Sequence, residues 1–149
     1  MTVPPSKRGR RMHHVGYVVH SIDSCVQGFQ RSLDAVWDGV VFEDRCQKVK
    51  VAFLSTGDSD TLIELVEPNA ADAPVRRFLA ETGGGLHHVC YEVDELDREL
   101  AATRTRGGLI AKRPMAAVAF GGRRIAWIIT AEKLLVELLE TAALREPAG

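Results

Sequence analysis

Hydrophobic and polar residues follow the same pattern in the two halves of this chain. A run rich in β-branched residues, at 14–19 and again at 87–93, is typical of a strand. Each run is followed by a residue that can cap a helix, Ser21 in the first half and Asp94 in the second. We therefore predict helices that follow these caps and end at about Leu33 and Arg106.

Further extended segments follow each predicted helix. Turn-forming residues divide them, at 56–60 in the first half and at Gly121-Gly122 in the second. The predicted strands are 40–43, 47–54 and 61–67, and then 109–112, 123–130 and 133–139. Each half is thus a βαβββ unit, with a linker at 68–74 and a short helix at 75–82 between them.

Two short motifs repeat in the same order. His14-Val15-Gly16 is matched by His88-Val89-Cys90, and Ile63-Glu64-Leu65 is matched by Val136-Glu137-Leu138. The two histidines are 74 residues apart and the two glutamates 73, so two independent motifs repeat at almost one spacing. We interpret this as a duplication within one domain at 12–140. Module one is 12–67, the linker and short helix are 68–84, module two is 85–140, and 1–11 and 141–149 are expected to be flexible termini.

Strand alternation predicts which way the repeated residues point. Val15, Tyr17 and Val19 share one face and should pack on the helix, which leaves His14 on the opposite face. The same reasoning applies to His88. The preceding histidines, His13 and His87, are predicted to face away from His14 and His88.

Glu64 and Glu137 stand within apolar runs and need a partner. An unpaired buried carboxylate costs several kcal/mol, so each must be salt-bridged, protonated or bound to a cation. Two imidazoles and two carboxylates suit one divalent ion such as Co, Zn, Mn, Ni or Fe. The alternative is a hydrogen-bonded histidine–carboxylate pair within each half.

Composition narrows the functional class. The 149 residues are 46% hydrophobic and 26% charged, as in one globular domain. A net charge of −1 gives no reason to expect nucleic acid or a membrane as a partner, and no apolar run approaches a spanning helix of about 20 residues. The basic N-terminus lacks a hydrophobic signal core, so we expect a cytoplasmic protein. Three scattered cysteines indicate neither a disulfide framework nor a thiolate zinc site.

These motifs resemble the vicinal oxygen chelate, or glyoxalase I-like, superfamily, and within it methylmalonyl-CoA epimerases most strongly. The resemblance spans residues 12–140 and is carried by the segments 14–16, 47–54, 63–68, 85–89 and 136–138. It implies an α+β fold in which two tandem βαβββ modules form an open, curved, mixed sheet around a central metal-binding cavity. It also implies that one divalent ion is held by four ligands: His14, Glu64, His88 and Glu137.

The resemblance further implies a reaction. A metal-dependent epimerase of methylmalonyl-CoA, or of a related acyl thioester, would form a metal-stabilised enolate and transfer a proton at the α-carbon. Glu64 and Glu137 are the expected catalytic acid and base, because the further glutamate that some relatives carry on the third strand is missing from 47–53. Gln47, Gly122 and Arg123 are expected substrate contacts. The expected partners are a small-molecule acyl thioester and a second copy of the chain in a homodimer.

Other members of the superfamily provide alternative functions. The hairpin at 130–133 is shorter than in the epimerases, which leaves open a glyoxalase-like lyase or another biosynthetic enzyme acting on a different chelating substrate. A binding protein of the bleomycin-resistance type is a further alternative. Such proteins generally lack metal ligands, so the four-residue set argues against that alternative.

Overall fold

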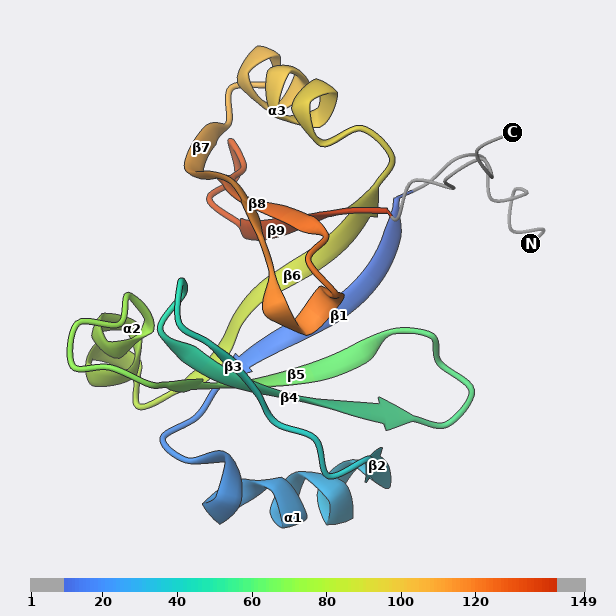
Figure 1. Ribbon diagram of the computed structural model, residues 1–149, viewed down its shortest axis with the longest axis vertical. Coiled ribbons are helices and arrows are strands. Elements are labelled where there is room, and N and C mark those ends of the chain that lie inside the picture. The colour runs from blue at the N-terminus through green and yellow to red at the C-terminus, as the bar shows by residue number, and fades with distance from the viewer. Residues whose placement is uncertain (1–9, 142–149) are drawn as a thin grey trace.

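The computed structural model describes residues 10–141 (Figure 1). Of the termini expected to be flexible, 1–11 and 141–149, residues 1–9 and 142–149 lie outside the described residues, whereas Arg11 begins the first strand. The first half contains β1 (Arg11–Val18), α1 (Ile22–Leu33), β2 (Ala35–Trp37), β3 (Phe42–Asp44), β4 (Val49–Thr56) and β5 (Leu62–Pro68). After α2 (Val75–Thr82), the second half contains β6 (Gly85–Val93), α3 (Leu96–Thr105), β7 (Leu109–Ala116), the 3₁₀ turn η1 (Val118–Phe120), β8 (Arg124–Ile129) and β9 (Leu135–Glu140).

One nine-stranded sheet runs through both halves in the order β2-β4-β5-β1-β6-β9-β8-β7, with β3 paired to β4. The two halves join where β1 pairs antiparallel with β6, whereas β5 and β9 pair parallel with β1 and β6 respectively. Figure 1 shows α1 and α3 at opposite ends of the molecule, with β1 and β6 passing between them. The predicted α+β class with an open, curved, mixed sheet is therefore confirmed.

The first helix begins and ends as its sequence predicts. The Ser21 hydroxyl accepts a hydrogen bond from the Ser24 amide at 3.3 Å, and Asp34 ends the helix with a left-handed φ of 50°. Ile22 and Val26 on the inner face of α1 are buried against the sheet, in one cluster with Leu65. Burial of this apolar face holds α1 against β4 and β5.

The second helix differs from its prediction. Glu95 occupies the N-cap position of α3 and makes no side-chain capping hydrogen bond, so the prediction that Asp94 caps this helix is wrong. The Asp94 carboxylate instead accepts a hydrogen bond from the Thr141 hydroxyl at 3.2 Å. This hydrogen bond connects the start of α3 with the residue that follows β9. Capping rules consider only neighbouring residues, so they could not predict a contact between positions this far apart in the sequence.

The central β1–β6 ladder contains two irregularities. Met12 pairs with Tyr91 and His14 pairs with Cys90, so His13 has no partner across the ladder. Gly16 pairs with His88 and Tyr17 pairs with Leu86, so His87 has none either. Each strand therefore carries a β-bulge at the histidine that precedes its predicted ligand, and a bulge locally interrupts the alternation of side chains.

Hydrophobic clusters lie on both sides of this sheet. One packs under α1, a second packs under α3, and two more line the opposite face around Val18, Val66 and Leu79 and around Cys90 and Ile125. Among residues 10–141, none of the helices combines the length and the apolar character needed to cross a membrane.

Candidate metal centre

Equivalent positions in the two halves bring four side chains together. Glu64 on β5 lies beside Gly16, two residues after His14 on β1. Glu137 on β9 lies beside Cys90, two residues after His88 on β6. Because the β1–β6 ladder is antiparallel, the two histidine–glutamate pairs face each other across the junction of the halves.

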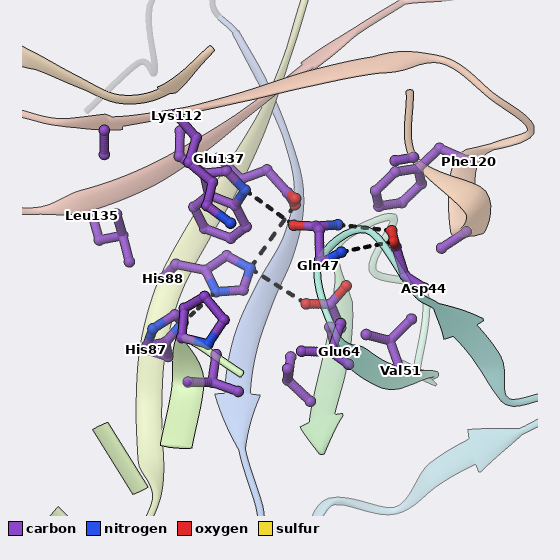
Figure 2. Close-up of a pocket in the computed structure, with 18 residues that line it drawn as sticks. Asp44, Gln47, Val51, Glu64, His87, His88, Lys112, Phe120, Leu135 and Glu137 are labelled. Carbon is purple, nitrogen blue, oxygen red and sulfur yellow. Dashed lines mark hydrogen bonds and ion pairs between the residues drawn. The ribbon is translucent and has the colours of Figure 1, made fainter. Parts of the chain in front are cut away.

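The donor atoms are close and buried. His14 Nε2 lies 3.1 Å from His88 Nε2. Glu137 Oε1 is 3.0 Å from His14 Nε2 and 3.9 Å from His88 Nε2, and Glu64 Oε1 is 3.5 Å and 3.3 Å from the same two atoms. All four residues are at most 5% exposed. Figure 2 shows Glu64 and Glu137 reaching the His88 ring from different directions.

This arrangement fits a divalent cation. Glu137 Oε1 is buried without a hydrogen-bond partner, although unpaired buried oxygens are costly. Donor atoms of His14, His88 and Glu137 all lie within 4.8 Å of one another, and Glu64 adds a second carboxylate to them. Nitrogen and oxygen donors that converge in this way suit a borderline divalent ion.

Gly16 makes room for one of these rings. A Cβ atom added at Gly16 would stand 2.0 Å from Cε1 and 2.5 Å from Nε2 of His88. No side chain can be accommodated there without moving the imidazole. The glycine of the first motif is therefore part of the site, although it offers no ligand atom.

Cys90 occupies the position in the second half that Gly16 occupies in the first. Its side chain is fully buried, and burial together with the nearby Glu137 carboxylate raises the pKa of the thiol far above its usual range. The protonated thiol lies beside Glu137, its partner across the β6–β9 ladder. Cys90 thus supports Glu137 and lacks the thiolate character of a nucleophile.

The two carboxylates have different environments. Burial raises the pKa of Glu64 against the opposing effect of His14, and the Glu137 carboxylate adds a smaller upward contribution. Burial also acts upward on Glu137, but the adjacent His14 and His88 rings hold the pKa of Glu137 below its usual value. Such separation of two neighbouring carboxylates is typical of acid–base pairs.

The prediction that His13 and His87 face away from the ligand histidines is wrong. His13 Nδ1 lies 2.8 Å from His14 Nδ1, and His87 Nδ1 lies 2.9 Å from His88 Nδ1. The two β-bulges explain why this prediction failed. A bulged residue is not bound by the regular alternation of side chains, so His13 and His87 can point toward their neighbours. Burial, with the neighbouring imidazole, lowers the pKa of both His13 and His87 to about 4.

The centre opens into a cavity of about 230 Å³. Its wall is mostly apolar, and Lys112, Asp44 and Gln47 are among its polar lining residues (Figure 2). The other lining residues include Val49, Val51, Val66, Val75, Phe120, Trp127 and Leu135. A bound molecule with an apolar group would match this lining.

Of the three residues predicted to contact the substrate, one lines the cavity and two do not. Gln47 lines the cavity, where it accepts a hydrogen bond from Trp127 Nε1 at 3.1 Å and donates one to Asp44 at 2.9 Å. Gly122 and Arg123 are not among the lining residues; Arg123 lies 3.5 Å from a Glu92 oxygen and 5.9 Å from the centre of the Phe120 ring. A role for these two residues in substrate binding stays a prediction.

The sequence patterns did not predict that aromatic residues surround the proposed metal ligands. The Trp127 ring meets His88 edge to face at 4.6 Å, and the Phe120 ring stacks on His14 at 5.8 Å. Phe120 belongs to the 3₁₀ turn, and Trp127 shows no local pattern that separates it from a core residue. Their roles depend on long-range packing between the halves.

Comparison with known proteins agrees with this geometry. The chain is 35% identical over 134 residues to the uncharacterized protein YqjC of Bacillus subtilis, covering 87% of this chain and 91% of that one. It is 30% identical over 87 residues to the ethylmalonyl-CoA/methylmalonyl-CoA epimerase of Cereibacter sphaeroides, covering 58% of this chain and 63% of that one. A solved methylmalonyl-CoA epimerase in complex with methylmalonyl-CoA and NH4+ superimposes with a TM-score of 0.77 at 25% identity, covering 93% and 99% of the two chains.

A family model also matches the chain. It describes the glyoxalase/bleomycin resistance protein/dioxygenase superfamily and matches residues 13–127, which include most of the β1–β6 ladder and three of the four converging side chains. The two halves of similar element order, the curved sheet and this match lead to one conclusion: the chain belongs to the glyoxalase/bleomycin resistance protein/dioxygenase superfamily.

Proposed function

We propose that this chain is a metal-dependent epimerase of methylmalonyl-CoA or of a related acyl thioester. The observation that carries the proposal is the pair of buried carboxylates, Glu64 and Glu137, which reach the same two histidines from opposite halves of the molecule. Relatives named as epimerases support it, although the aligned part covers 63% of the Cereibacter sphaeroides enzyme and the longer match is to an uncharacterized protein.

His14, Glu64, His88 and Glu137 would hold one divalent ion of Co, Zn, Mn, Ni or Fe. When bound, such an ion supplies Lewis-acid polarisation of a carbonyl oxygen and so makes the neighbouring C–H bond more acidic. The choice among these metals rests on the donor set alone.

The chain's own carboxylates would move the proton. One carboxylate takes the α-proton from one face of the substrate, and the protonated form of the other returns a proton to the opposite face, which inverts the configuration. The lower pKa of Glu137 favours it as the acceptor, and the raised pKa of Glu64 favours it as the donor. The apolar wall at Val51 and Val66 would keep water from the reacting carbon.

Exchange of the α-proton tests this proposal. Metal-loaded protein is incubated with methylmalonyl-CoA in deuterated buffer, and deuterium at the α-carbon is followed by mass spectrometry. We expect exchange that stops with chelator and falls at least 100-fold in Glu137→Gln, because one of the two proton carriers is lost. The matched control is Glu81→Gln on the exposed surface of α2, which should exchange at the wild-type rate.

A protein that binds one metal ion per chain and gives no exchange would contradict the epimerase proposal. The short β8–β9 turn, closed by a hydrogen bond from the Thr130 amide to the Leu134 carbonyl at 2.9 Å, favours one second candidate. That candidate is a glyoxalase-like lyase acting on a different chelating substrate, for which this turn need not cover a CoA thioester.

A further inference from the structure

We propose that His13 and His87 are positioning residues, each of which accepts a hydrogen bond from the Nδ1–H of the adjacent ligand histidine. This inference rests on the proposed metal site. It adds two residues to the four that would contact the ion and assigns each a defined protonation state.

The geometry repeats in both halves. The Nδ1 atoms of His13 and His14 are 2.8 Å apart, and those of His87 and His88 are 2.9 Å apart. In both pairs the ligand histidine turns its Nε2 atom toward the centre, where the two Nε2 atoms lie 3.1 Å apart. Two equivalent contacts in two halves of different sequence argue against a chance arrangement.

Each outer ring is fixed by its surroundings. The His13 ring meets Phe120 edge to face at 5.2 Å, and the His87 ring meets Phe78 in the same way at 4.8 Å. The β-bulges set the backbone so that each outer ring can reach its neighbour. A rigid outer ring can hold the orientation of the ring that it contacts.

Proton counting fixes the tautomers. An imidazole that binds a cation through Nε2 uses the lone pair there, so its proton lies on Nδ1. The Nδ1–H of His14 then needs an acceptor, and the nitrogen 2.8 Å away is Nδ1 of His13. His13 must therefore offer a lone pair at Nδ1 and carry its own proton on Nε2. The same reasoning applies to His88 and His87.

A competing arrangement uses His13 differently. Donor atoms of His13, His14 and Cys90 also lie within 4.8 Å of one another, and this group could hold a metal ion by itself. That arrangement would use a thiolate of Cys90, whereas our proposal leaves the thiol protonated against Glu137. The two arrangements therefore predict different spectra for the Co²⁺-loaded protein.

Substitutions at the outer histidines test the proposal. Metal-free full-length protein is titrated with Co²⁺ against a competing chelator. Partners of ligand histidines typically contribute about 10- to 100-fold in metal affinity, so we expect His13→Leu and His87→Leu to weaken Co²⁺ binding by that factor. His13→Asn and His87→Asn, whose side-chain oxygen can accept in place of Nδ1, should recover most of the loss. The matched control is His20→Asn at an exposed histidine, which should bind like wild type.

Several outcomes overturn the inference. Folded leucine variants that bind Co²⁺ as tightly as wild type contradict it, as do asparagine variants that bind no better than leucine variants. A sulfur-to-cobalt charge-transfer band would instead assign the metal to the His13–His14–Cys90 group. Should wild type bind no Co²⁺ at all, the proposed metal site fails and this inference fails with it, whereas equal affinities in wild type and leucine variants overturn the inference alone.

Nuclear magnetic resonance keeps the proposal testable even where a leucine variant does not fold. In Zn²⁺-loaded wild type, ¹⁵N shifts of the imidazoles should report the proton of His14 and His88 on Nδ1 and that of His13 and His87 on Nε2. Protons on Nδ1 of either outer histidine would contradict the proposed hydrogen bonds.

Discussion

Gly16 pairs with His88 across the β1–β6 ladder, and the imidazole of His88 occupies the space where a Cβ of residue 16 would stand. The position two residues after His14 is therefore constrained by a ring from the other half of the chain. The constraint acts on the proposed ligand and leaves the hydrophobic clusters under the helices untouched.

Gly16→Ala should displace His88 and weaken Co²⁺ binding at least 10-fold, because the added Cβ would stand 2.0 Å from Cε1 of the ring. The measurement is metal affinity by competition titration. The matched control is Gly28→Ala in α1, where an added Cβ meets nothing within 4 Å. That control should keep wild-type affinity and raise the free energy of unfolding by about 0.5–1 kcal/mol. Equal metal affinity in both variants would contradict the role given to Gly16.

Cys90 should resist thiol reagents in the folded protein. It is fully buried and its thiol pKa is strongly raised, whereas Cys46 is exposed. Timed alkylation at pH 8 followed by peptide mass spectrometry should label Cys46 first and label Cys90 only in denaturant. Rapid labelling of Cys90 in native protein would show a more open centre than the one described here.

Binding of a divalent ion should stabilise the fold by mass action. At a free metal concentration of 100 times the Kd, the gain is about 2.7 kcal/mol, which corresponds to a rise in Tm of roughly 5–10 °C for a chain of this size. Scanning calorimetry with Co²⁺ and with excess chelator measures this difference. Glu64→Gln should shrink the metal-dependent shift, because one carboxylate donor loses its charge. An unchanged shift in that variant would exclude Glu64 from the ligand set.

Trp127→Phe removes the indole donor that joins β8 to Gln47 in the first half. We expect a loss of about 0.5–1.5 kcal/mol in the free energy of unfolding, measured with urea. In a double-mutant cycle with Gln47→Ala, the two losses should not add, because both remove one interaction. Trp37→Phe is the matched control: its indole donates to the Val40 carbonyl within the first half, so it should show no coupling to Gln47. Additive losses for Trp127→Phe and Gln47→Ala would contradict the link between the halves.

Local sequence patterns predicted much of the fold. The helix α1 begins after Ser21 as expected, and α2 spans the predicted residues 75–82. The side chains of His14, His88 and their two glutamate partners lie close together, as the repeated motifs predicted. This could be predicted because strand alternation and the common spacing of the motifs can be read from the sequence alone. Strand ends shifted by a few residues, and β7 extends to Ala116, beyond the predicted end at 112.

The features that escaped prediction depend on contacts between distant segments. The bulges at His13 and His87 are defined by register across the β1–β6 ladder, and no local signal in either strand reveals them. The link between Gln47 and Trp127 joins residues that are 80 positions apart. The short strand β2 forms because Ala35–Trp37 finds a partner in β4, which again is a tertiary contact.

The difference between Gly16 and Cys90 is one place where the two halves of the centre depart from twofold symmetry. If the two halves were identical, a substrate could bind in two orientations related by a 180° rotation, and both would have the same energy. Here the Cys90 thiol lies beside Glu137, whereas Gly16, which has no side chain, lies beside Glu64, so the two poses differ in energy. Glu64 and Glu137 therefore have unequal neighbours, and a substrate placed between these two carboxylates has one preferred orientation rather than two equivalent ones.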